Sequence, residues 1–238
     1  MKSMYTNYLF IFAPLMYAFS IYVDMFTYHL KFNLNDEKNY RYLFSLINVF
    51  QYSSRAFVLI FAPIMAYYTE TIRDKNLIWQ MTLLCHILVI FLIIPLYNTN
   101  YSKKLSFFLI RKLNLILGKL EYKKNFSVDI NPMQRKKTRI ETKGDVAFIL
   151  FSFIAFLIFS FSMTFLYYIA FYYPNKVLIL SSYSQLLNAF GAMSILLFID
   201  PRIMAAMDRG DGVKELNFLT TSRIMAHFVL IIILLFII

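Results

Sequence analysis

The sequence contains little of what enzymes commonly use for chemistry. Its single cysteine, Cys85, excludes an intramolecular disulfide and any metal site built from several cysteines. Its three histidines are far apart in the chain, and none has a second ligand at the i+4 spacing typical of a helical zinc site. No Gly-rich phosphate-binding loop and no Ser-His-Asp arrangement can be recognised. We therefore predict no metal, no cofactor and no catalytic residue.

Charged residues are also scarce. They make up 16% of the 238 residues, whereas 60% are hydrophobic, and the mean hydropathy is +0.60. This balance departs from that of a soluble domain in the direction expected for helices embedded in lipid. Six apolar stretches are long enough to cross a hydrocarbon core of about 30 Å, for which about 20 helical residues suffice. They lie near 8–30, 42–68, 77–97, 146–173, 177–200 and 218–238.

These stretches predict an all-α polytopic protein with six transmembrane helices. Residues 1–97 hold the first three helices, 98–145 form a loop, and 146–238 hold the last three, all within one membrane domain. Acidic residues are fewer than basic ones, 13 against 24, and twelve of the basic residues lie in the loop. Because cytoplasmic loops retain Lys and Arg, we predict that the loop is cytoplasmic and that both termini face outward. The net charge of +11 is thus a topology signal, and nucleic acid is not an expected partner.

The basic loop contains a segment with helical apolar spacing, KKLSFFLIRKLNLILGKL (103–120). The apolar positions of this segment are Leu105, Leu109, Leu113, Ile116 and Leu120, with Lys and Arg between them. This pattern predicts an amphipathic helix that rests on anionic lipid headgroups. A charged connector that only anchors the topology fits the pattern equally well.

A polar stripe runs along the second predicted helix, within the segment SLINVFQYSSRAFVLIFAP (45–63). Its members are three or four residues apart and therefore share one helix face. They are Ser45, Asn48, Tyr52 and Arg55, with Gln51 at the edge. A charged guanidinium at bilayer depth costs about 2.5 to 3.5 kcal/mol on insertion scales, so a compensating partner is expected for Arg55.

Three further helices carry polar residues at similar spacing. The first has Tyr17, Ser20, Asp24 and Tyr28; the fifth has Ser181, Ser184 or Gln185, Asn188 and the small Gly191 and Ala192; the sixth has Thr220, Arg223 and His227. Because unsatisfied polar groups are costly in hydrocarbon, these faces are expected to turn toward one another or toward a water-filled cavity.

Two interpretations of these faces remain open. In the first, Asp24 forms a buried ion pair with Arg55 or Arg223, and the amides and hydroxyls hold the helices together without a ligand. In the second, two arginines for one aspartate leave an excess of cationic donors that binds an anion. Arginine suits phosphate because its planar fork makes two charge-assisted hydrogen bonds and stays protonated. Two arginines in a partly dehydrated cavity would therefore suit a diphosphate.

An acidic segment, DPRIMAAMDRGD (200–211), follows the fifth predicted helix and contains Asp200, Asp208 and Asp211. Such carboxylates can hold Mg²⁺ against a phosphorylated substrate, which would make the protein a membrane-embedded enzyme acting on a polyprenyl phosphate or a phospholipid. In the other interpretation Pro201 and Gly210 mark a helix end and a turn, and the acidic side chains are solvated.

Each half of the chain also contains a Ser-Arg pair, at Ser54-Arg55 and at Ser222-Arg223. Inverted repeats are common in transporters, but the residues around the two pairs do not align well. An internal repeat therefore stays an open alternative.

The order of these motifs resembles that of the Amj family of lipid II flippases. In the first half the similarity lies in YVDMFTYHLKF and YLFSLINVFQYSSRAFVLIFAPIMA, through Asp24, Tyr28, Ser45, Leu46, Asn48, Ser54, Arg55 and Pro63. In the second half it lies in Pro174, Ser181, Asn188, Asp200, Pro201, Asp208, Ser222 and Arg223. The resemblance implies a bacterial cytoplasmic-membrane protein that translocates undecaprenyl-diphosphate-linked peptidoglycan precursor from the inner to the outer leaflet.

On this hypothesis the substrate is a lipid-linked oligosaccharide diphosphate, and the surrounding partners are membrane lipids. Arg55 and Arg223 are expected to bind the diphosphate, and the neighbouring hydrogen-bonding residues are Asn48, Gln51, Asn188 and Ser181. Asp24, Asp200 and Asp208 are expected to couple transport to an ion or to pair with the arginines. Six helices are few for so large a headgroup, so we also predict a homodimer. A non-catalytic membrane scaffold is the third alternative.

Overall fold

The computed structural model describes residues 2–33, 40–117, 139–209 and 212–237, and the regular structure of these residues is helical throughout. Leu120 and Asp211 lie outside the described residues. The elements are α1 (Lys2–Asn33), α2 (Tyr40–Tyr67), η1 (Tyr68–Ile72), α3 (Lys75–Ile93), η2 (Ile94–Tyr97), α4 (Thr99–Leu117), α5 (Lys143–Tyr172), η4 (Pro174–Lys176), α6 (Val177–Ser194), η5 (Ile195–Ile199), α7 (Asp200–Asp208) and α8 (Gly212–Phe236).

Six spans within the described residues are long and apolar enough to cross a membrane, which confirms the predicted all-α polytopic class. They are Tyr8–Asn33, Tyr42–Ile72, Lys75–Tyr97, Lys143–Tyr172, Pro174–Asp208 and Gly212–Phe236. The fifth span continues past the predicted end at residue 200. Pro201 lies in the first turn of α7, directly after the π turn η5, and the helical path continues through it. The wider turn provides room for the proline ring next to the preceding turn.

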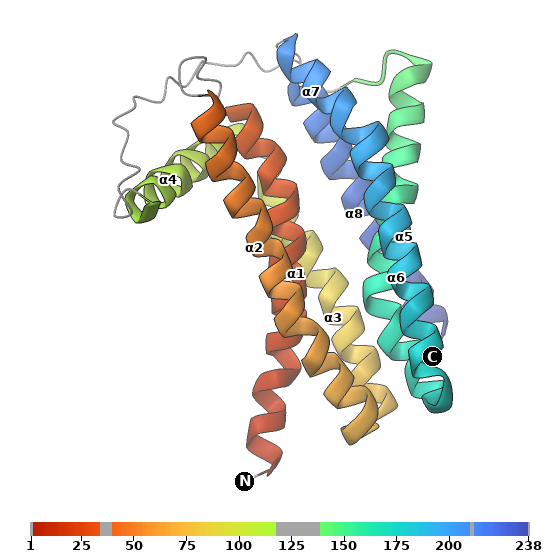
Figure 1. Cartoon of the computed structure of the whole chain (residues 1–238). Coiled ribbons are helices and arrows are strands. Elements are labelled where there is room, and N and C mark those ends of the chain that lie inside the picture. Colours follow the sequence, from red (N-terminus) through yellow and green to blue (C-terminus); the bar gives the residue numbers. More distant parts are fainter. Residues whose placement is uncertain (1, 34–39, 118–138, 210–211, 238) are drawn as a thin grey trace.

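The two halves of the chain share one packing order. In the first half α1 packs against both α2 and α3, and in the second half α5 packs against both α6 and α8. The halves meet chiefly where α3 packs against α8. Corresponding helices run in opposite directions through the bundle, and both termini lie at the end opposite to α4 and α7 (Figure 1). The two halves therefore have the same packing order in opposite orientation, which three alternating spans in each half produce by themselves, and the internal repeat stays an open alternative.

The two Ser-Arg pairs do not lie at corresponding positions of the two halves. Ser54 and Arg55 lie on α2, the second span of the first half, whereas Ser222 and Arg223 lie on α8, the third span of the second half. The repeated feature is the order of packing, which depends on apolar surface and span length and does not require matching dipeptides.

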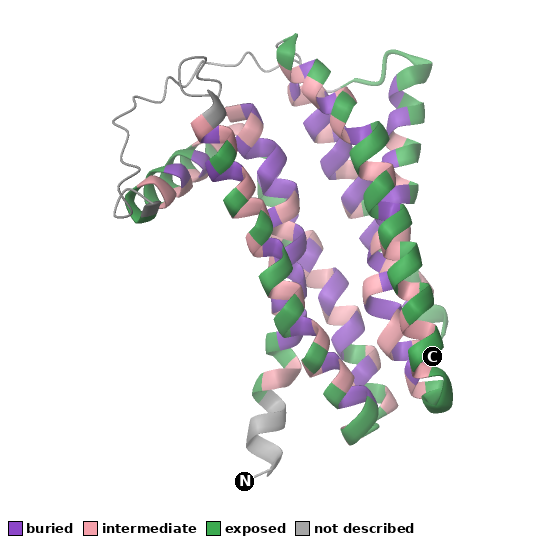
Figure 2. Ribbon diagram, viewed as in Figure 1, coloured by how far each residue is buried: buried purple, intermediate pink, exposed green. Residues whose placement is uncertain are grey.

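Burial is greatest at the centre of the bundle. The central α1 and α8 spans are about half buried, whereas the spans that contain α2 and α6 are only 17% and 22% buried (Figure 2). Three polar contacts follow the antiparallel α3–α8 contact from end to end. Trp79 Nε1 donates to the Leu234 carbonyl at 3.0 Å, His86 contacts His227, and the Tyr97 hydroxyl lies 2.7 Å from that of Thr221.

The predicted amphipathic helix is present as α4 and begins before residue 103. Its apolar stripe packs against the bundle, with Ile110 buried and Leu105, Leu109 and Leu113 partly buried. Asn33, at the end of α1, donates hydrogen bonds of 3.0 Å to two buried hydroxyls of α4, Ser102 and Ser106. The exposed residues of α4 include Lys104, Phe107, Phe108, Arg111, Lys112, Leu115 and Ile116. Leu105, Leu109 and Leu113 thus face protein, whereas the predicted stripe residue Ile116 is exposed, together with Leu115 and the aromatic and basic residues.

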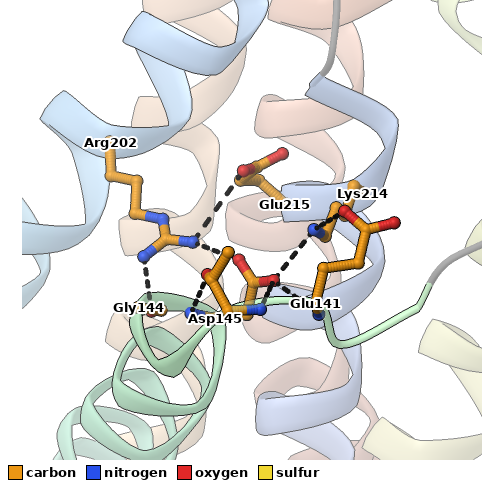
Figure 3. A network of polar contacts seen from close by, with 7 residues as sticks. Glu141, Gly144, Asp145, Arg202, Lys214 and Glu215 are labelled. Atoms are coloured by element: carbon orange, nitrogen blue, oxygen red, sulfur yellow. Dashed lines mark hydrogen bonds and ion pairs between the residues drawn. The ribbon is translucent and has the colours of Figure 1, made fainter.

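An ionic cluster joins α5, α7 and α8 at the end of the bundle that holds α7 (Figure 3). Arg202 donates to Asp145 Oδ1 at 3.0 Å and to the Gly144 carbonyl at 2.6 Å, and it lies 3.9 Å from Glu215 Oε1. Lys214 Nζ lies 2.9 Å from Asp145 Oδ2 and 3.1 Å from Glu141 Oε2. Asp145 also completes a capping box at the start of α5. One buried carboxylate thus connects three helix ends.

Replacing this carboxylate should destabilise the fold. We expect Asp145→Ala to lower the free energy of unfolding in detergent by about 1.5 to 3 kcal/mol, because hydrogen bonds to a charged group are lost. Glu141→Ala is the matched control, since Glu141 also contacts Lys214 but its side chain is 64% exposed. Its effect should stay below about 1 kcal/mol. Equal effects of the two substitutions on denaturant unfolding would contradict this role of Asp145.

Candidate functional site

Arg223 is the most deeply buried charge of the membrane-spanning bundle. Its exposed fraction is 2%, although it lies within the last transmembrane span. The guanidinium carbon lies 4.3 Å from the ring centre of Phe156 and 5.4 Å from that of Phe159, both on α5. Its Nε is buried and has no hydrogen-bond partner among the described residues. A buried donor of this kind is rare, because leaving it unpaired is costly.

Asp24 of α1 is partly buried, and the Ser54 hydroxyl and the charges of Arg223 and Arg55 act on its carboxylate. Among the described residues no ion pair joins Asp24 to either arginine. We call Asp24, Ser54, Arg55 and Arg223 the anion site.

The predicted α2 stripe does not turn inward, since Ser45, Tyr52 and Arg55 are exposed and α2 packs through apolar residues such as Leu46 and Phe61. The guanidinium carbon of Arg55 lies 5.9 Å from the ring centre of Tyr52.

A second polar contact links α1 to α7. The Tyr28 hydroxyl donates a hydrogen bond to Asp200 Oδ1. The charge of Lys31 acts on Asp200, and the Lys31 ammonium lies 5.6 Å from the ring centre of Tyr28. Tyr28 is one helical turn from Asp24, so this contact adjoins the anion site and connects the two halves of the chain.

A buried histidine pair lies on the other side of the anion site, where α3 meets α8. His86 and His227 are fully buried, and their Nδ1 atoms are 2.9 Å apart. Two hydroxyls of α5 lie within hydrogen-bond distance of the other two ring nitrogens. Ser160 Oγ lies 3.4 Å from His227 Nε2, and Thr164 Oγ1 lies 3.3 Å from His86 Nε2. The ring of Tyr17, on α1, contacts both imidazoles edge-on.

The remaining predicted substrate-binding residues lie on the two outer helices. Asn48 and Gln51 are partly exposed on α2. Ser181 and Asn188 are partly exposed on α6, and Asn188 Oδ1 is buried without a hydrogen-bond partner among the described residues.

The α6 stripe contacts α5. Its Ser184 donates to the Ser162 carbonyl, and its Gly191 is so close to α5 that an added Cβ would lie 3.2 Å from Phe159 atoms. This part of the stripe therefore holds two helices together.

The acidic segment does not gather into one site within the described residues. Asp200 and Asp208 lie at opposite ends of the nine-residue α7, about 12 Å of helix rise apart. Asp208 is exposed, whereas Asp200 pairs with Tyr28. Among the described residues there is no group of three side chains that could ligate a metal ion.

Sequence reasoning missed three residues beside the anion site, namely His86, Ser160 and Thr164. His86 lies alone among apolar residues of the third span, so spacing within its own helix gives no signal. The α5 residues do give a signal in the sequence. Polar residues recur every four positions along one face of this helix, at Ser160, Thr164, Tyr168 and Tyr172.

Comparison of the chain with family models, with curated proteins and with solved structures finds no match.

Proposed function

We propose that this protein is a flippase for a lipid-linked oligosaccharide diphosphate in the bacterial cytoplasmic membrane. The specific substrate is lipid II, the undecaprenyl-diphosphate-linked peptidoglycan precursor, moved from the inner to the outer leaflet. The observation that carries the proposal is the buried Arg223, whose Nε has no hydrogen-bond partner among the described residues. The resemblance in motif order supplies the particular substrate.

The charges of the anion site favour a substrate with more than one negative charge. Two guanidinium groups act on the single carboxylate of Asp24, so the cluster carries an excess positive charge. A diphosphate compensates this excess and supplies acceptors for the unpaired donor of Arg223. Burial strengthens the attraction, because the effective dielectric constant inside the bundle is lower than in water.

The positions of the two arginines suit a substrate that stays partly in lipid. Arg55 is exposed on the outer helix α2, and Arg223 is buried in the centre of the bundle. We infer that Arg55 meets the diphosphate first and that Arg223 binds it during transfer, while the polyprenyl chain remains in the bilayer. We infer that the ends of α1, α3 and α7 face the cytoplasm, because the loops next to them are rich in Lys and Arg.

The location of the anion site between the two halves of the chain supports transport rather than a passive scaffold. Transporters built from inverted repeats bind substrate near the membrane midplane, between the repeats, and alternate access by moving one repeat against the other. Arg223 belongs to one half and Asp24 to the other, so the anion site spans this contact. Movement between the halves would therefore change the distance between these charges. The predicted homodimer stays a prediction, which mass measurement in detergent can check.

The proposal can be tested by rescue in bacteria depleted of their own lipid II flippase. We expect the wild-type protein to restore growth and the exposure of lipid-linked precursor at the outer leaflet. Arg55→Ala should restore neither when inserted at the wild-type level, because the first diphosphate contact is lost. Arg111→Ala, which removes an exposed arginine of α4, is the matched control and should rescue as wild type does. Wild-type protein that inserts well and restores neither would overturn the proposal for lipid II.

A further inference from the structure

We propose that the His86–His227 pair is a proton-binding site, and that the proton it takes up is bound together with the anion at Arg223. The inference rests on the proposed function and extends it, because it names an ion that binds with the substrate and the residues that hold it.

The hydrogen bonds around the pair fix the protonation of each ring. Thr164 Oγ1 donates its only proton to the Ser160 carbonyl at 2.8 Å, so it can only accept from His86 Nε2. His86 therefore carries its proton on Nε2, and its bare Nδ1 accepts from His227 Nδ1–H. The Nε2 of His227 is then bare and accepts from the Ser160 hydroxyl.

With both rings neutral, every nitrogen of the pair has a partner. An added proton has only one position that keeps the contact between the rings. At His86 Nδ1 it would place two N–H groups against each other across 2.9 Å. At His227 Nε2 the added proton takes the place of the hydroxyl proton that Ser160 donates. The Ser160 hydroxyl then rotates, and its oxygen accepts a hydrogen bond from His227 Nε2–H. The incoming proton comes from water and adds to the lone pair of Nε2, no covalent bond breaks, and the bond to His86 becomes charge-assisted.

Burial of both rings and the positive charge of Arg223 oppose this protonation in the unliganded protein. Arg223 lies one turn from His227 on α8, about 6 Å along the helix. Tyr17 faces both rings from α1, and Cys85 adjoins His86 on α3. From α5 the pair meets the hydroxyls of Ser160 and Thr164. Arg223 is thus the charged residue nearest to His227 along α8. Its positive charge repels a proton that is added to the histidine pair.

A diphosphate bound at Arg223 removes this repulsion. The anion neutralises the guanidinium, and its remaining negative charge attracts a proton to His227. Because linkage is reciprocal, a proton on the pair must tighten the binding of the anion by the same factor. Substrate and proton therefore bind together and leave together. A typical coupling of this kind changes affinity roughly 5-fold to 150-fold.

The test is calorimetric titration of the full-length protein in detergent with a short-chain polyprenyl diphosphate sugar. This probe is substituted at both phosphorus atoms, so its own charges do not titrate in the neutral range. Titrations in two buffers of different ionisation enthalpy give the number of protons taken up on binding. We expect net uptake by the wild type, and an affinity that rises roughly 5-fold to 150-fold as the pH falls.

His227→Gln and His86→Gln remove the proton site while keeping a side chain that can form hydrogen bonds. Both should lose proton uptake and the pH dependence of Kd, whereas the neighbouring Cys85→Ala should keep both. Wild-type binding without proton uptake overturns the inference and leaves the proposed function standing, and this result does not depend on whether the histidine variants fold. Uptake that persists unchanged in folded histidine variants also overturns it. A wild type that binds no diphosphate at any pH overturns the inference together with the proposed function.

Discussion

Arg223→Met is expected to abolish transport while leaving the protein at least as stable as the wild type. The buried guanidinium has an unpaired Nε, and its desolvation is unfavourable to folding. Methionine keeps most of the side-chain volume and contacts with Phe156 and Phe159, so no large cavity forms. Loss of one partner of a buried charge pair should weaken diphosphate binding by about 2 to 5 kcal/mol, which is roughly 30-fold or more in Kd.

The matched control is Arg202→Met, the same substitution at an arginine that is paired. Arg202 donates to Asp145 and to the Gly144 carbonyl, so its loss should lower the stability of the protein in detergent. Thermal unfolding of the two variants, with titration of a diphosphate probe, separates the two roles. If Arg223→Met destabilises the protein as Arg202→Met does, Arg223 is a structural residue and the scaffold interpretation gains support.

Asp24→Asn is expected to tighten anion binding and to slow transport. The substitution removes the carboxylate on which the charges of Arg55 and Arg223 act, so the site becomes more positive. We expect Kd for the diphosphate to fall about 10-fold, which corresponds to ~1.4 kcal/mol. Release should slow for the same reason, because the carboxylate no longer competes for the arginines.

Binding and transport must be measured on the same preparation, with Glu70→Gln as the control. Glu70 is an exposed carboxylate of η1 and is not one of the predicted site residues, so its loss should change neither quantity. Weaker binding by Asp24→Asn, with a lowered unfolding temperature, would show that Asp24 acts through structure. Tighter binding with faster transport would contradict the role of Asp24 in release.

Hydropathy predicted the membrane spans well because each span must be apolar over a fixed length, whatever it packs against. Two charged members of the anion site were also predictable. Asp24 and Arg223 are costly in lipid, so their helices had few alternatives to turning them inward, whereas Arg55 is exposed on α2. The end of the fifth span was not predictable from Pro201 alone, since a proline in the first turn of a new helix does not interrupt the chain's helical path.

Other parts of the site depend on tertiary packing that spacing does not contain. The stripes of α2 and α6 look alike in the sequence, yet Ser184 and Gly191 of α6 contact α5. A stripe identifies a face and not its partner. The histidine pair forms because α3 and α8 cross where His86 and His227 lie, and a contact between residues so distant in the chain leaves no local pattern. The leucines of α4 likewise predicted the correct packing face, but this face packs against the helix bundle and not against lipid headgroups.

The central claim is that this chain moves a diphosphate-linked lipid between leaflets by means of the buried Arg223. The most direct test is reconstitution of the purified protein in liposomes that carry a fluorescent lipid-linked diphosphate disaccharide, with a membrane-impermeant quencher added outside. The account requires that wild-type protein make the inner-leaflet label accessible faster than protein-free liposomes do, and that Arg223→Met not do so. Wild-type liposomes that behave as protein-free ones, or an Arg223→Met protein as fast as the wild type, would contradict it.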